Sequence, residues 1–168
     1  MSYNVVTILF ALSLISSGRI LGQANWSRYK PGSICALIAQ ERDGIQASIR
    51  AGHVPLTVTS ANSFPTLAVA EYQDSTRPTS PAHLQVLTVW AKTQQRRLDV
   101  GALFPFEVLF REDTLSLWVP VQAVLIPALK QELQRGDRVA VYVGYIGAQA
   151  DDSTAIDWVF IINEFQKR

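Results

Sequence analysis

The side chains best suited to catalysis or metal binding in this 168-residue chain are its two histidines, His53 and His83, and its single cysteine, Cys35. Neither histidine has a Cys, His, Asp or Glu neighbour at the spacing of one to four residues from which compact metal sites are built. Cys35 stands between Ile34 and Ala36, and apolar surroundings suppress the reactivity of a thiol. The sequence therefore predicts no metal site, and it indicates that Cys35 is a small apolar filler.

Three carboxylates, Glu107, Glu112 and Asp113, lie close together in the chain. Two carboxylates that flank a cleft can hydrolyse a glycan, although carboxylates at a turn are more often simply solvated. No Gly-x-Ser-x-Gly turn occurs to present a nucleophilic serine. Gly144 and Gly147 fall inside a strand pattern rather than ahead of a helix, so no phosphate loop is indicated. We therefore predict no catalytic residue and no cofactor, and an envelope-glycan hydrolase remains an alternative.

Four aromatic residues are the candidates for a binding surface: Trp90, Trp118, Tyr142 and Trp158. Alternation places Trp118 and Tyr142 on the strand faces opposite the clearest apolar ones. Exposed rings on such a face can stack on bases, sugars or the side chains of a partner. The alternative is that an N-terminal helix covers them as a second layer. If that helix packs there, Trp118 and Tyr142 will be buried and no stacking platform exists on that face.

The first part of the domain predicts one long helix. Isoleucines and a leucine recur at helical spacing at positions 34, 37, 38, 45 and 49. Ser33 can cap this helix and Gly52 suits its end, so we expect a helix over 33–51, or two helices that meet at Gly44. Short strands are expected within 54–72. The segment 73–82, rich in Pro, Ser and Thr, predicts a loop.

The second part predicts five strands and one helix. Apolar runs and alternation indicate strands over 84–92, 104–111, 114–119, 138–146 and 157–165. Helical spacing over 121–135 places a helix between the third and fourth strands, with a break or kink at Pro127. The stretch Gly136-Asp137 ends this helix.

This element order, together with the entry Gly136-Asp137-Arg138-Val139 to the fourth strand, resembles an OB-fold over about 84–165. An OB-fold is a five-stranded, partly open Greek-key barrel. The resemblance implies an α+β, mainly β domain in which the N-terminal helix packs on an OB-like antiparallel barrel with a helix between strands three and four. An α+β roll gives the same element order and remains the alternative. The resemblance concerns the fold and points to no specific family.

Residues 1–24 have the features of a secretory signal peptide. An apolar run over 5–15 precedes Gly22 and Ala24, whose small side chains suit a cleavage site after Ala24. The run is about half of the roughly 20 residues that a transmembrane helix needs. We expect export to the periplasm or outside the cell, a single globular domain over 25–168, and no transmembrane span in the mature form. An uncleaved helix is the alternative.

Charge and cysteine content narrow the function. Removal of Arg19 with the signal peptide leaves 14 of the 15 basic residues against 14 acidic ones, and this neutrality argues against nucleic acid as a partner. One cysteine allows no internal disulfide. We expect an exported, non-catalytic binding or adaptor module that recognises a protein, peptide or envelope component. An assembly subunit that pairs a strand edge within 54–72 is a second alternative beside the hydrolase.

Overall fold

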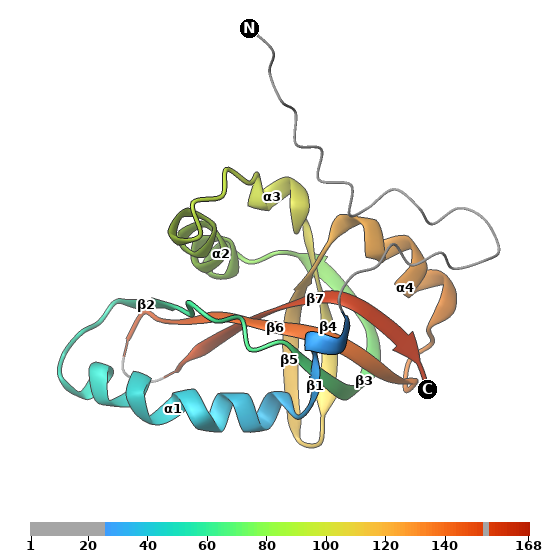
Figure 1. The fold of residues 1–168 in the computed structure, drawn as a ribbon, viewed down its shortest axis with the longest axis horizontal. Coiled ribbons are helices and arrows are strands. Elements are labelled where there is room, and N and C mark those ends of the chain that lie inside the picture. The colour runs from blue at the N-terminus through green and yellow to red at the C-terminus, as the bar shows by residue number, and fades with distance from the viewer. Residues whose placement is uncertain (1–25, 153–154) are drawn as a thin grey trace, which may run out of the picture.

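The computed structural model describes residues 26–152 and 155–168 (Figure 1). The expected signal peptide and its cleavage site lie outside these residues. None of the helices in the described part of the chain combines the length and the apolar composition that crossing a membrane requires.

The described chain forms strands, α-helices and short 3-10 turns in the following places. The strands are β1 Lys30–Pro31, β2 Leu56–Thr59, β3 Thr66–Pro78, β4 Phe106–Glu112, β5 Leu115–Val121, β6 Arg138–Ala150 and β7 Asp157–Lys167. The helices are α1 Ile34–Arg50, α2 Pro81–Thr93, α3 Val100–Leu103 and α4 Ile126–Glu132, and the 3-10 turns are η1 Trp26–Arg28 and η2 Ala123–Leu125.

Five strands close into a barrel. The sheet order is β1-β3-β4-β5-β7-β6-β2, and an additional pairing of β3 with β6 joins the two ends of the inner five strands. Within the barrel only β5 and β7 run parallel, where Val121 pairs with Ile162. The helix α4 connects the third barrel strand, β5, to the fourth, β6. The closed barrel confirms the expected α+β fold with an OB-like barrel.

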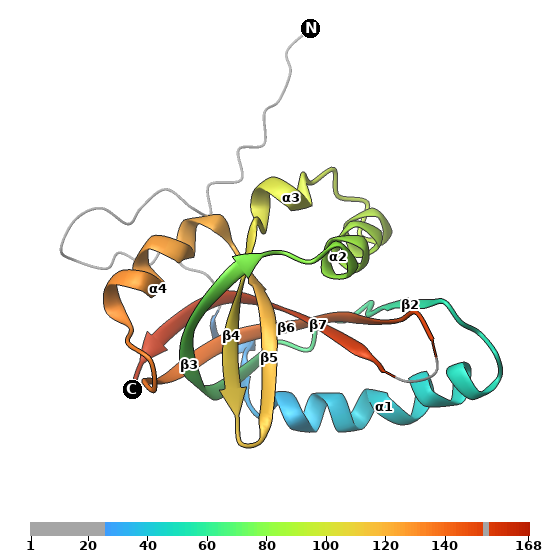
Figure 2. The same ribbon diagram turned by 180° about the vertical axis from the view of Figure 1, so that it is seen from behind.

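The strand expected over 84–92 is wrong, because this segment is the helix α2 (Figure 2). The side chain of Ser80 accepts a hydrogen bond from the backbone N–H of His83, and Pro81 occupies the first turn, as both residue types favour at a helix start. A short apolar run fits a buried strand or a buried helix equally well, so periodicity alone did not separate the two.

The first barrel strand is instead β3, so the barrel begins at Thr66 rather than at residue 84. The loop expected over 73–82 is also wrong, since β3 continues to Pro78 through a register shift between Tyr72 and Thr76. That irregularity places an unpaired stretch of polar residues inside the strand and hides its alternation. Both α2 and α3 are therefore inserted between the first two barrel strands.

The predicted long helix is confirmed as one helix, α1, which continues through Gly44. Ser33 caps it by accepting a hydrogen bond from the backbone N–H of Ala36. The helix expected over 121–135 is shorter, because β5 extends to Val121 and η2 follows. Of the break or kink expected at Pro127 the structure has the break: η2 ends at Leu125, and Pro127 lies in the first turn of α4, where a missing N–H costs nothing.

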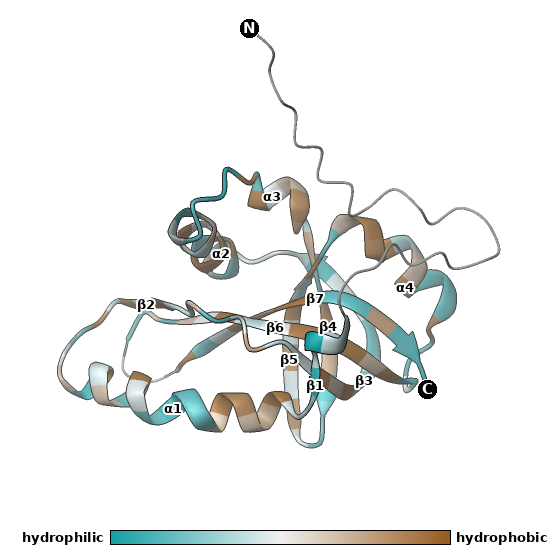
Figure 3. Ribbon diagram, in the orientation of Figure 1, coloured by the Kyte–Doolittle hydropathy of each residue, from teal (hydrophilic) through white to brown (hydrophobic). Residues whose placement is uncertain are grey.

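The apolar side chains form two clusters on opposite faces of the β6–β7 hairpin. The first contains Ile38 of α1 and Leu129 of α4 together with residues of the barrel strands such as Val141. The second lies outside the barrel, where Leu87 of α2 packs with Ile146 and neighbouring residues. The hairpin therefore lies between α1 and α2 (Figures 1 and 2). The connection that follows α2 and the C-terminal end of β7 are hydrophilic (Figure 3).

Candidate functional site

The structure does not bring the four candidate aromatic residues together. Trp90 is half-buried against the cluster outside the barrel. Trp118 is half-buried on β5. Trp158 and Tyr142 are 9% and 8% exposed, and Trp158 belongs to the same apolar cluster as Ile38 and Val141. A continuous stacking surface made of these four rings is therefore not present.

The covering of Tyr142 and Trp118 differs from the one expected. A ring of η1 and the ring that follows it cover Tyr142, with the centroids of Trp26 and Tyr29 at 4.8 and 5.3 Å from its own. The guanidinium carbon of Arg77 lies 4.1 Å from the ring centroid of Trp118, as in a cation–π contact. The helix α1 instead belongs to the apolar cluster that contains Val141, on the other face of the hairpin.

A chain of charged side chains links four elements beside Trp118. Arg77 of β3 pairs with Oε1 of Glu107 on β4. The Nδ1 atom of His83 on α2 lies 2.6 Å from Oε2 of Glu107, close enough for an ion pair although not aligned as a regular hydrogen bond. The Nε2 atom of His83 lies 3.1 Å from Oδ1 of Asp157, the first residue of β7. This cluster, Arg77, His83, Glu107 and Asp157, is called the His83 network below.

The His83 network holds the imidazole in its charged form. Burial opposes that charge, since the side chain of His83 is 3% exposed, but Asp157 and Glu107 outweigh burial and raise the pKa of His83 to about 9. Burial also opposes ionisation of Glu107, yet contacts with His83 and Arg77 keep the pKa of its carboxyl below the usual value. Each ring nitrogen of His83 faces a carboxylate, so the residue holds α2 against β4 and β7. A protonated imidazole with both nitrogens engaged cannot readily accept a proton as a general base.

Sequence reasoning missed this network because its members are far apart in the chain. Asp157 lies 74 positions after His83, beyond any local spacing rule. One signal was available, since Glu107 is an acid in a strand of apolar residues between Phe106 and Val108. A buried carboxylate requires a cationic partner, but only the fold identifies which one.

The other candidate carboxylate, Glu112, caps the start of α1. Its Oε1 accepts a hydrogen bond from the backbone N–H of Ile34 at 3.1 Å, and its Oε2 accepts from the N–H of Cys35 at 2.7 Å and from the hydroxyl of Ser33 at 2.9 Å. A negative charge at a helix N-terminus also interacts favourably with the helix dipole. Asp113 lies exposed in the hairpin turn. Structural roles therefore account for Glu107 and Glu112.

Cys35 is half-buried next to the same cap. Burial first, and then the neighbouring carboxylate of Glu112, raise the pKa of its thiol to about 11. A thiol with so high a pKa is almost entirely protonated at neutral pH, and it is therefore a poor nucleophile.

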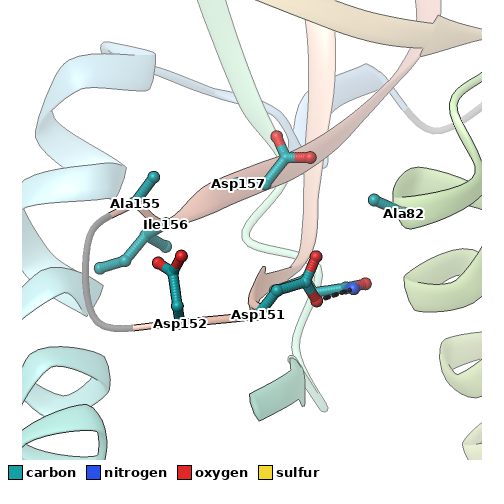
Figure 4. A pocket seen from close by; sticks show the side chains of 7 residues that line it. Ala82, Asp151, Asp152, Ala155, Ile156 and Asp157 are labelled. Carbon is teal, nitrogen blue, oxygen red and sulfur yellow. Dashed lines mark hydrogen bonds between the residues drawn. The ribbon is translucent and has the colours of Figure 1, made fainter. Parts of the chain in front are cut away.

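An open hollow of about 360 Å³ lies where α2 approaches the β6–β7 loop, and Figure 4 shows the side chains that line it. Ala82 lines it from α2, Asp151 and Asp152 line it from the loop, and Asp157 lines it from the start of β7. Gln149 also lines it, and its Nε2 donates to Asp151 at 2.7 Å, while its buried Oε1 has no partner within the described residues. We call this feature the acidic hollow; its oxygen atoms suit ligand groups that are cationic or donate hydrogen bonds. No group of His, Cys, Asp and Glu in the described ranges is arranged to hold a metal ion.

A second hollow, of about 510 Å³, lies on the other side of the β6–β7 loop against α1. Its lining residues are Arg42, Gln46, Ile49, Arg50, Ala155, Ile156 and Trp158. We call it the basic groove. Ala155 and Ile156 line both hollows, so this loop separates an acidic surface from a basic one.

Comparison of the chain with protein-family models, with curated proteins and with solved structures finds no match.

Proposed function

We propose that the protein is an exported, non-catalytic binding or adaptor module that recognises a protein, a peptide or another envelope component. The observation that carries this proposal is that the acid–base groups take part in structural contacts, while other polar side chains line two hollows at the surface. Glu107, His83 and Glu112, which are suited to acid–base chemistry, are occupied by structural partners. The open polar surfaces are instead the two hollows beside the β6–β7 loop.

The position of the hollows supports a role in recognition. Barrels of the OB type bind ligands with the loops that follow their first and fourth strands. Here α2 follows the first barrel strand, the β6–β7 loop follows the fourth, and the two meet at Ala82 and Asp157. The His83 network fixes this meeting point, because it ties α2 to β4 and to the first residue of β7.

The test is affinity capture with the purified full chain from its native envelope fraction, followed by crosslinking. The wild type is compared with a variant that carries Asp151→Asn and Asp152→Asn, and with a matched control, Asp113→Asn, on the β4–β5 turn. We expect the wild type and the control to enrich the same component and the double variant to lose it. Equal enrichment by an unrelated neutral exported domain would contradict the proposal.

Edge-strand assembly is the second candidate, favoured by the position of β2. In the described part of the chain β2 pairs with β6 alone, so its other edge has no neighbouring strand. An open edge can accept a strand from a second chain. Sedimentation velocity over a wide concentration range tests this candidate, which predicts an oligomer that grows with concentration. A monomer at every concentration contradicts self-assembly through this edge.

A further inference from the structure

The basic groove carries two arginines on one helix face. Arg42 and Arg50 both line it, eight residues apart on α1. At 1.5 Å of rise per residue their Cα atoms are separated by about 12 Å along the helix axis. Gln46 lies between them, one turn from each, and adds an amide that can donate or accept.

Both guanidinium groups are available to a ligand. Across the part of the chain that is described, no ion pair engages Arg42 or Arg50. Their acidic neighbours Glu41 and Asp43 are not among the residues that line the groove. Arginine presents a planar fork that binds a carboxylate through two parallel hydrogen bonds. The groove therefore suits a ligand with two anionic groups about 12 Å apart, the separation of the two arginines along the helix axis.

The apolar part of the groove's lining favours some classes of anionic ligand over others. This lining includes Ile49 and Ile156, together with Trp158, which is only 9% exposed. Glycans are commonly held by stacking on an open aromatic ring, and the ring of Trp158 is nearly closed to such contact. Aliphatic side chains instead suit an apolar side chain of a peptide. The overall charge of +1 also disfavours a nucleic acid.

We propose that the basic groove binds an extended acidic segment of a partner protein. In a strand, residues four apart lie on the same face about 13 Å from each other, and the residue between them shares that face. Two carboxylates at this spacing reach Arg42 and Arg50, while the middle side chain packs on Ile49 and Ile156. The inference rests on the proposed function, for which it names the class of partner.

The test uses the purified full chain and a synthetic probe, acetyl-Ser-Glu-Thr-Leu-Thr-Glu-Ser-amide, in which both glutamates and the leucine share one face. Binding is measured by fluorescence anisotropy or calorimetry. We expect Arg42→Gln and Arg50→Gln each to weaken binding about three- to tenfold. Arg42→Lys should retain part of the affinity, because lysine keeps the charge but not the fork. The matched control Arg97→Gln, in the exposed connection after α2, should bind like the wild type.

Two further probes test the recognised features. A probe with glutamine in place of both glutamates, and one with the glutamates only two residues apart, should bind at least several-fold more weakly. The inference is overturned if the acidic probe shows no binding up to about 1 mM. It is also overturned if the variant with Arg42→Gln and Arg50→Gln binds as well as the wild type, or if all three probes bind equally.

A capture experiment separates this inference from the proposed function. If the variant with Arg42→Gln and Arg50→Gln captures the same envelope component as the wild type, the groove inference fails and the proposed function stands. If the wild type captures nothing specific but binds the acidic probe through both arginines, the proposed function fails and the groove inference stands. Self-association that this variant abolishes would identify the occupant as a second copy and overturn the choice of a separate partner.

Discussion

The Nδ1 atom of His83 lies 2.6 Å from Oε2 of Glu107, and the two side chains are 3% and 0% exposed. A helix inserted into the barrel is thus held to the second barrel strand by a charge pair shielded from water. The partners of this pair at the surface, Arg77 and Asp157, are about half-exposed. Solvent therefore reaches the ends of the His83 network but not its centre.

Loss of His83 should strongly destabilise the fold. The change His83→Ala leaves Glu107 buried with Arg77 as its remaining cation, and removal of one partner from a buried pair costs about 3 kcal/mol or more. Urea unfolding followed by circular dichroism measures this change. The matched control is His53→Ala, at an exposed position, which should change the free energy of unfolding by less than about 0.5 kcal/mol. Equal effects of the two variants would show that the pair does not stabilise the fold.

Stability should fall at alkaline pH. The pKa of His83 is about 9 in the folded protein against 6.5 as its ordinary value. A pKa raised by folding gives stability that is fully present below about pH 6.5 and is lost as the pH rises through 9. Thermal unfolding of the wild type between pH 6 and 10 should show this loss, and His83→Gln should not show it. Nuclear magnetic resonance titration of the imidazole protons with a midpoint near the ordinary value would refute the assignment.

The cap at Glu112 should control both α1 and the Cys35 thiol. Glu112→Ala removes the acceptors of two backbone N–H groups and should lower the free energy of unfolding by about 1–2 kcal/mol. The same change removes a charge that raises the pKa of Cys35, so alkylation by iodoacetamide at pH 8 should become faster. The matched control is Glu41→Gln, which should leave the alkylation rate unchanged. An unchanged rate in Glu112→Ala would contradict this account of the thiol.

Two glycine substitutions should act in opposite directions. A Cβ atom at Gly147 would lie 2.0 Å from the carbonyl oxygen of Val58 on β2, so Gly147→Ala should force β2 away from β6 and cost about 1–3 kcal/mol. At Gly44, in the exposed middle of α1, a Cβ atom would meet nothing within 4 Å, and Gly44→Ala should stabilise the fold by up to about 1 kcal/mol. Thermal unfolding of both variants checks the signs. An unchanged thermal stability in Gly147→Ala would mean that β2 does not pack closely against β6.

Local sequence patterns were sufficient to predict the elements whose caps and apolar spacing can be read directly from the sequence. The long helix α1 has a cap at Ser33 and isoleucines on one face, and both features were sufficient to place it. The helix α2 was mistaken for a strand because its central apolar run is short, and such a run fits a buried strand or a buried helix equally well. In β3 the register shift after Tyr72 interrupts the alternation that identifies strands.

The candidate site was less accessible to sequence reasoning because tertiary contacts assemble it. Alternation correctly placed Tyr142 on an outer face, but which segment covers that face depends on where η1 lies. Arg42 and Arg50 are ordinary exposed helix positions until the β6–β7 loop turns their helix face into the wall of a groove. Spacing along the chain contains no information about such a loop.

The closure of the barrel also has a kinetic consequence. β3 pairs with β6 through partners such as Thr66 and Val143, which lie 143 − 66 = 77 positions apart in the chain. Contacts between residues so distant in sequence slow folding, because a long loop must be ordered before its contacts stabilise it. Until β6 pairs with it, the backbone N–H and C=O groups along one edge of β3 have no strand to bond with. The last steps of folding are therefore expected to join the two halves of the chain, and the intermediate most exposed to aggregation is the one with this seam still open.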